Sequence, residues 1–229
     1  MKLLILASDP MEFPGILARS SDVVATPVQV RWAREARLGD HHLLLAANGV
    51  GARRAAAAVA AAARQFRPEA VVNTGFCGAL DEKLGVADLV VADRVTDGGR
   101  IAECTTFRCS LAHGTVFTAD HVIQTAEEKR RLFEAGASVV EMEAAGAAAA
   151  ARALGLPFYC VKAVSDLAGE SLANDFNAAL RPDGQFATMS ILGRALRRPS
   201  VRVPELLRLR RRSLRAARAL GAFFADIRF

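Results

Sequence analysis

The chain has 229 residues, of which 52% are hydrophobic and 24% are charged, with a net charge of +6. This length and composition suffice for one sizeable core. Aromatic residues are not interleaved with the basic ones, so a nucleic-acid partner is not expected. No uncharged apolar run approaches the roughly 18 to 20 residues of a membrane span, and the opening apolar run is too short for a secretory signal. We therefore expect a soluble, cytoplasmic protein.

Short apolar runs alternate along the chain with longer segments of helical character. This alternation is typical of an α/β fold around a central, largely parallel sheet. Residues 52–65 and 143–154 are dense in alanine, which predicts helices that pack closely on the sheet. The expected strands are residues 2–7, 42–47, 70–74, 87–91, 114–118, 138–141 and 158–163.

Glycines follow two of these strands. Residues 48–51 read Asn-Gly-Val-Gly, and residues 75–78, Gly-Phe-Cys-Gly, predict a sharp turn after strand 70–74. Ligands of open α/β sheets bind at the carboxyl ends of strands. Backbone N–H groups of glycine turns can bind water or phosphate, so Gly49, Gly51 and Gly75 are candidates for that contact.

Two carboxylates are expected at the same end of the sheet. Glu143 follows strand 138–141 and opens a helix, and Asp166 closes the next strand. Taken singly, each acid is also explained as a residue of a helix start. Cleavage of an N-glycosidic bond needs a proton donor, a sugar anchor and a placed nucleophile. Acidic side chains can supply all three.

Three motifs carry a resemblance to a known family. They are Asn-Thr-Gly-Phe-Cys-Gly at 73–78, Met-Glu-Ala at 142–144 and Ser-Asp at 165–166. In order, spacing and strand context they resemble the purine nucleoside phosphorylase and 5'-methylthioadenosine/S-adenosylhomocysteine nucleosidase family over about residues 1–170. The resemblance implies a single domain over residues 1–229 with the three-layer αβα nucleoside phosphorylase/hydrolase-like fold. It also implies cleavage of the N-ribosidic bond of a purine nucleoside, with adenine as the expected base.

The same resemblance implies roles for individual residues. Asp166 would protonate the purine at N7. Glu143 would accept hydrogen bonds from the ribose hydroxyls, and Met142 would pack beneath the ribose ring. Glu12 stands where the family's nucleosidases carry the glutamate that activates water, whereas its phosphorylases have a phosphate-binding arginine nearby. A carboxylate there favours hydrolysis, because it repels phosphate and can accept a proton from water. Arg53 and Arg54 leave phosphorolysis open as the alternative.

The resemblance also implies base-binding residues and an oligomeric state, and the sequence shows no sign of a cofactor. The four histidines and four cysteines have no spacing typical of metal ligands, so neither metal nor organic cofactor is implied. Family members form homodimers or larger homo-oligomers, which we expect here too. The expected base-binding residues are Phe76, Cys77, Gly78, Val122 and Ser165.

The C-terminal part adds an arginine-rich amphipathic helix at about 204–224. Such a helix generally docks on its own domain or on a subunit neighbour, and peripheral contact with a membrane is the alternative. Residues 180–185, 198–199 and 204–208 are similar to the tail of hopanoid-associated phosphorylases, which implies adenosylhopane as a candidate substrate. A non-catalytic nucleoside- or membrane-binding module remains the alternative of another class.

Overall fold

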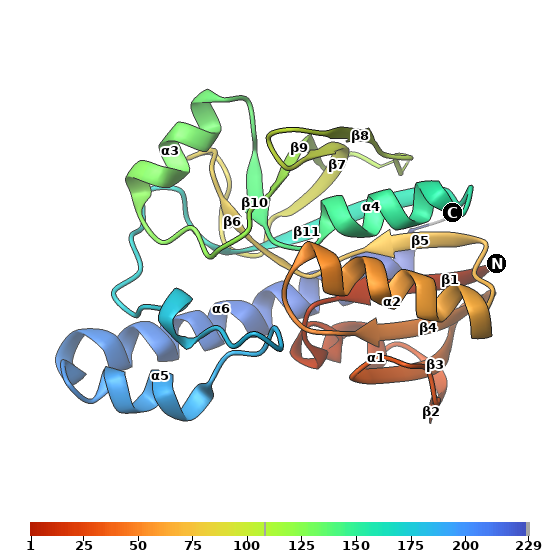
Figure 1. Cartoon of the computed structure of the whole chain (residues 1–229), viewed down its shortest axis with the longest axis horizontal. Coiled ribbons are helices and arrows are strands. Elements are labelled where there is room, and N and C mark those ends of the chain that lie inside the picture. The colour runs from red at the N-terminus through yellow and green to blue at the C-terminus, as the bar shows by residue number, and fades with distance from the viewer. Residues whose placement is uncertain (108, 228–229) are drawn as a thin grey trace.

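The computed structural model describes residues 1–107 and 109–227. Within them, a mixed sheet of eleven strands forms the centre of the molecule (Figure 1). Its order is β2-β3-β4-β1-β5-β11-β6-β10-β9-β7-β8. The strands are β1 (Lys2–Ala7), β2 (Ser21–Ala25), β3 (Trp32–Leu38), β4 (His41–Ala47), β5 (Ala70–Asn73), β6 (Phe76–Ala79), β7 (Leu89–Thr96), β8 (Ile101–Glu103), β9 (Ala112–Thr118), β10 (Val139–Glu141) and β11 (Phe158–Asp166).

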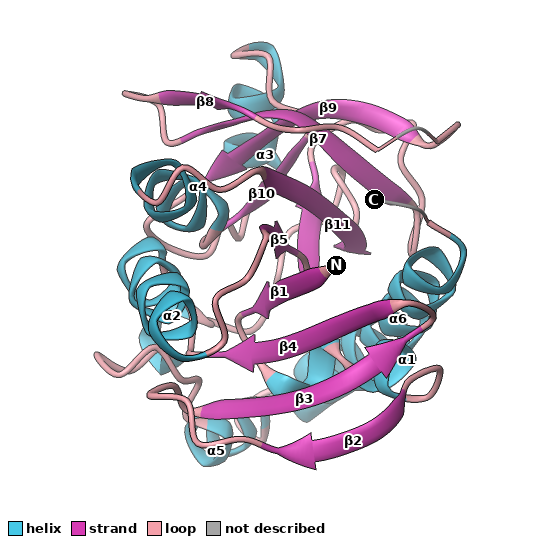
Figure 2. Cartoon of the chain, turned by 90° about the vertical axis from the view of Figure 1, so that its right-hand side faces the viewer, coloured by secondary structure: helices cyan, strands magenta, loops and turns pink. Residues whose placement is uncertain are grey.

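Helices cover both faces of this sheet (Figure 2). On one face α2 packs against α4, and on the other α1 packs against α6. Each face has its own cluster of buried apolar side chains. The helices are α1 (Pro14–Leu17), α2 (Ala52–Gln65), α3 (Ala126–Glu134), α4 (Ala144–Ala153), α5 (Thr188–Ala195) and α6 (Pro199–Asp226), with 3-10 turns η1 (Pro10–Glu12) and η2 (Asn177–Ala179).

Small residues let these helices approach one another closely. A Cβ atom on Gly146 of α4 would lie 1.9 Å from the carbonyl oxygen of Ala52 in α2. On the opposite face, a Cβ on Gly15 would lie 1.9 Å from the carbonyl oxygen of Ala217. The alanine-rich segments therefore pack closely, as their composition predicts.

The expected strands all overlap observed ones, and the α2 helix has the predicted bounds. The sharp turn expected over residues 75–78 is wrong in part, because only Thr74 and Gly75 separate β5 from β6, which begins at Phe76. Strands β2, β3 and β8 were not expected either. The observed sheet also closes on itself in one half. Strand β11 pairs in parallel with β6 and antiparallel with β7, which joins β11, β6, β10, β9 and β7 into a ring.

The ring is irregular where β11 ends. The register between β11 and β6 shifts between Val164 and Asp166. An irregularity of this kind bends the strand and re-aims the side chains next to it. Here it turns Ser165 and Asp166 toward the carboxyl ends of the neighbouring strands.

The C-terminal helix is longer than the expected 204–224. Pro199 lies in the first turn of α6, where a missing N–H costs nothing, and Pro204 lies inside the helix. The second half of α6 buries Leu220 and Phe224 against α1 and β11. That half docks on its own chain. Within the described residues, none of the helices combines the length and the apolar content needed to cross a bilayer.

Candidate active site

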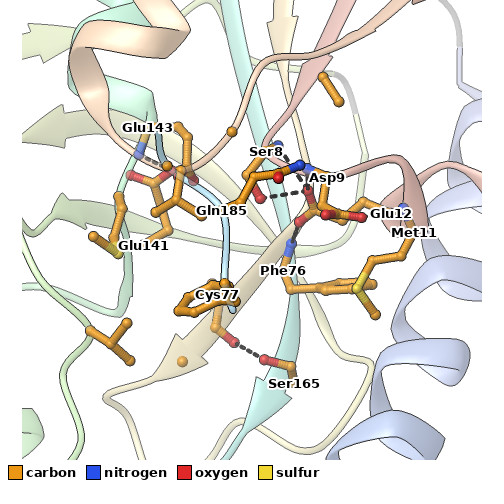
Figure 3. A pocket seen from close by; sticks show the side chains of 18 of the residues that line it. Ser8, Asp9, Met11, Glu12, Phe76, Cys77, Glu141, Glu143, Ser165 and Gln185 are labelled. Atoms are coloured by element: carbon orange, nitrogen blue, oxygen red, sulfur yellow. Dashed lines mark hydrogen bonds between the residues drawn. The ribbon is translucent and has the colours of Figure 1, made fainter. Parts of the chain in front are cut away.

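A cavity of about 460 Å³ opens at the carboxyl ends of the central strands. Segments that follow β1, β4, β10 and β11 contribute to its walls, as does the start of β6. This is the edge at which the sequence places the carboxylates (Figure 3). Of the predicted site residues, those that line the cavity are Glu12, Gly49, Phe76, Cys77, Gly78, Val122, Met142, Glu143, Ser165 and Asp166.

Glu12 is held in the cavity wall by several hydrogen bonds. It ends the turn η1, whose N-cap Asp9 forms a capping box with it. Its Oε2 accepts hydrogen bonds from Ser8 N at 2.8 Å, Ser8 Oγ at 2.9 Å and Asp9 N at 2.9 Å, and its Oε1 accepts one from Phe76 N at 2.7 Å (Figure 3). Burial raises the pKa of Glu12, although Lys162 and these N–H groups oppose the shift. The carboxylate is thus fixed in orientation.

Gly75 makes room for that carboxylate. Its φ is +119°, a conformation that L-residues rarely adopt, and a Cβ there would lie 2.3 Å from Glu12 Oε1. Gly75 does not line the cavity, so its place is behind Glu12 rather than at the predicted water or phosphate contact.

The other two glycines expected to offer free N–H groups have partners within the protein. Gly49 N donates to the carbonyl oxygen of Ser8 at 2.9 Å. Gly51 N donates to Glu143 Oε1 at 3.0 Å. Arg54 extends to the carbonyl oxygen of Pro182, and with Arg53 it lines a neighbouring hollow instead of this cavity. Gly49, Gly51 and Arg54 therefore have partners within the protein, and Arg53 lines the neighbouring hollow.

A buried ion pair, which motif reasoning missed, supports the side of the cavity that Glu143 lines. Lys162 Nζ lies 2.8 Å from Glu141 Oε2 and donates to the carbonyl oxygen of Thr74 at 3.0 Å. Glu141 also accepts from Thr118 Oγ1 at 2.7 Å and from the N–H of Glu143 at 2.9 Å. Burial would raise the pKa of Glu141, but Lys162 holds it below its usual value. Glu141 thereby fixes the backbone that carries Glu143.

Glu143 is buried and lines the cavity. Burial, followed by the charges of Glu141 and Glu12, raises its pKa to about 8, against the opposing effects of Lys162 and the Gly51 N–H. The side chain is therefore largely protonated at neutral pH in this structure. A ligand that donates hydrogen bonds to it would favour the ionised form.

Asp166 lies at the end of β11 with a lysine as its partner. Lys129, on α3, is fully buried, and its Nζ lies 2.5 Å from Asp166 Oδ2 and 2.8 Å from the carbonyl oxygen of Leu167. Ser165 Oγ lies 2.9 Å from Asp166 Oδ1. A Cβ on Gly78 would lie 2.9 Å from Oδ2, so glycine is needed for this position of the carboxylate. Lys129 looks in the sequence like a solvent-facing helix residue, which is why it was missed.

The remaining predicted base contacts differ in availability. Ser165 Oγ lies 3.1 Å from the carbonyl oxygen of Cys77 (Figure 3). Burial raises the pKa of the Cys77 thiol, which disfavours the reactive thiolate. Val122 lines the cavity, but its N–H donates to Asn177 Oδ1 at 2.7 Å and its carbonyl accepts from Asn177 Nδ2 at 2.9 Å. Its backbone is not free to contact a base as folded. Residues that were not among the predicted site residues also line the cavity, among them Arg31, Trp32, His121, Gln185 and Phe186.

Comparison with known proteins agrees with this architecture. A 5'-methylthioadenosine/S-adenosylhomocysteine nucleosidase of Staphylococcus aureus is 28% identical over 174 residues, which cover 62% of this chain and 76% of the relative. The crystal structure of an S-adenosylhomocysteine nucleosidase of Streptococcus pyogenes superposes with a TM-score of 0.73 at 22% identity, covering 100% of this chain and 98% of that one. A futalosine hydrolase of Helicobacter pylori has a TM-score of 0.72 at 18% identity, covering 99% and 97%. The predicted fold is confirmed.

A family model supplies the assignment. The model described as "Phosphorylase superfamily" matches residues 2–111 and 103–191, which is most of the chain. These residues contain every motif that carried the resemblance. The family resemblance drawn from the motifs is confirmed, and the chain belongs to the phosphorylase superfamily.

Proposed function

We propose that this protein is a purine nucleosidase that cleaves the N-ribosidic bond of an adenine nucleoside with water. The observation that carries the proposal is the carboxylate of Glu12, fixed by four donors in a cavity that Asp166 also lines. An oriented carboxylate is suited to accept a proton from water, and a second acid is needed for the leaving base. The name of the S. aureus relative supports a nucleosidase activity.

The reaction places one acid at each end of the breaking bond. As the bond between C1' and the purine N9 breaks, its electron pair moves onto the base, and Asp166 in its protonated form transfers a proton to N7. The base then leaves neutral. Water attacks C1' and gives a proton to Glu12, so the products are free adenine and the free sugar. Lys129 acts on Asp166 as a positioning residue, through its 2.5 Å contact.

The ribose is held between these groups. Glu143 accepts hydrogen bonds from the ribose hydroxyls in its ionised form, which also stabilises the positive charge that develops on the sugar. Met142 packs beneath the ring. Glu141 keeps Glu143 in place through its backbone N–H, so the ion pair with Lys162 contributes to binding from a distance.

Phosphorolysis is the second candidate, because Arg31 lines the cavity. Against it, Arg31 contacts Asp183 at 3.5 Å, and the carboxylate of Glu12 lines the same cavity. A phosphate dianion placed there would meet a fixed carboxylate. A non-catalytic binding module would be favoured by a blocked cavity or a solvent-facing Asp166. Instead, the cavity is open and the side chain of Asp166 is only 16% exposed.

The test is release of adenine from adenosine, methylthioadenosine and a 5'-alkyl adenosine, each with and without phosphate. Hydrolysis predicts release without phosphate, with free sugar as the second product. Release that requires phosphate would overturn it. Preference for the alkyl substrate would support adenosylhopane, which stays a prediction, as does the expected homo-oligomer. No release from any of the three would favour a different base or the binding module.

A further inference from the structure

Positive charge is concentrated in one part of the chain. Residues 188–218 contain ten arginines and one glutamate, a sum of +9. Since the whole chain has a net charge of +6, the remaining residues sum to −3. The one glutamate, Glu205, is buried, accepts hydrogen bonds from the backbone N–H groups of Ala173 and Asn174, and lies 4.0 Å from Arg208. Arg194 and Arg212 pair with acids outside the segment, Asp175 and Glu170. The other arginines give the segment its excess positive charge.

The same segment exposes large apolar side chains. Met189 is 80% exposed and Leu196 is 70% exposed. Met189 and Leu192 lie on α5 and Leu196 is its C-cap residue, and the three have the i, i+3 and i+7 spacing of one helix face. Helix α6 adds Val201, Leu207 and Leu214, each about half exposed. We call this surface, formed by α5 and the first half of α6, the basic apolar face. It extends away from the rest of the molecule (Figure 1).

We propose that the basic apolar face docks this protein on the surface of an anionic lipid bilayer. Arginines bind lipid headgroups, and aliphatic side chains beside them enter the boundary between headgroups and acyl chains. An anionic bilayer therefore satisfies both features of the face at once.

Two other kinds of partner, a second copy of the chain and a single-stranded nucleic acid, each satisfy only one of these features. A second copy docking through the same face would bring two surfaces of like charge together. A single-stranded nucleic acid would use the arginines, but it relies on aromatic stacking, and residues 188–218 contain no aromatic side chain. The exposed methionine and leucines would then have no partner.

Docking in this way would bring the cavity close to the membrane. Gly184, Gln185 and Phe186 line the cavity and directly precede α5 in the chain. The rim of the cavity and the basic apolar face are therefore adjacent parts of one segment. This consequence rests on the proposed function, whereas the docking itself does not.

The experiment is sedimentation with vesicles of phosphatidylcholine, with and without phosphatidylglycerol, at low and high salt. The full-length protein is expected to bind the anionic vesicles at least about tenfold more tightly than the neutral ones, and less tightly at high salt. Leu196→Glu combined with Met189→Glu should weaken that binding about tenfold or more. Ile101→Glu, on β8, is the matched control, because Ile101 is 62% exposed and lies outside the face. It should bind like the wild type.

Circular dichroism and thermal unfolding show whether each variant is folded, and neither measurement depends on the proposed activity. None of the altered residues lines the cavity. Failure of the proposed function would leave vesicle binding intact. Equal binding to both vesicle types would overturn the docking proposal, as would unchanged binding by the double variant. Tighter binding to single-stranded RNA than to anionic vesicles, unaffected by the double variant, would overturn it in favour of a nucleic-acid partner.

Discussion

Replacing Gly75 by alanine tests whether the orientation of Glu12 matters. The added Cβ would lie 2.3 Å from Glu12 Oε1, whereas ordinary contact begins at 3.4 Å, so the carboxylate must retreat by about 1 Å. A displacement of that size at a catalytic group costs about 100-fold in rate. We expect kcat for adenine release to fall by about that factor, with a smaller change in KM.

The same substitution also strains the backbone, and a matched variant separates the two effects. Gly136 has φ +94° and no atom within 4 Å of its would-be Cβ. Gly136→Ala therefore carries a similar backbone cost, about 1 to 3 kcal/mol of unfolding free energy, without touching Glu12. Urea denaturation should show a loss of stability in both variants, larger in Gly75→Ala because its Cβ also meets the buried Glu12 side chain. Steady-state kinetics should show a loss of kcat in Gly75→Ala alone. Wild-type kcat in Gly75→Ala would refute the reasoning.

Three further predictions concern the acids and their partners. Asp166→Asn should lower kcat about 10²- to 10⁴-fold because the proton donor is lost, and it should also lower Tm because the buried Lys129 loses its charged partner; equal activity would exclude the role. Lys129→Met should lower kcat about 10- to 100-fold with KM nearly unchanged, since Asp166 loses the contact that positions it; a change in KM alone would contradict this. Glu143 takes up a proton on folding because its pKa rises from 4.5 to about 8. Its contribution to the free energy of unfolding is therefore full below about pH 4.5 and is lost as the pH rises to about 8. In urea denaturation, Glu143→Gln should therefore gain stability relative to the wild type across that window, and a constant difference would contradict the assignment.

The sequence predicted the parts of the fold that depend on burial. Strands β1, β4 and β5 are continuous apolar runs because both of their faces are covered, and such runs are visible without a structure. Strand β3 was missed because its buried residues, such as Ala33 and Ala36, are separated by charged ones. Strand β6 contains the Phe-Cys-Gly residues that follow Gly75, and these look like a turn.

The candidate site was predictable as far as motifs mark the ends of strands. Glu12 and Asp166 come to one cavity because they follow β1 and β11, which run in the same direction and present their carboxyl ends at one edge. Glu143 follows β10, which pairs antiparallel with β6, so its approach to the same cavity depends on the ring of strands and was not predictable from parallel pairing. The lysines that pair with Asp166 and with Glu141 were not predictable. Lys129 belongs to a charged helix and Lys162 to a strand, and only the tertiary packing buries them beside Asp166 and Glu141.

The source of the oxygen in the sugar product tests the central claim most directly. The protein is incubated with an adenine nucleoside in ¹⁸O-labelled water containing phosphate, and the sugar is analysed by mass spectrometry. Hydrolysis activated by Glu12 predicts a free sugar that gains one ¹⁸O at C1'. The samples are taken from a single turnover and quenched quickly, because the C1' oxygen of a free sugar exchanges slowly with solvent through the open-chain form. A sugar 1-phosphate without the label would contradict it and would assign the nucleophile to phosphate.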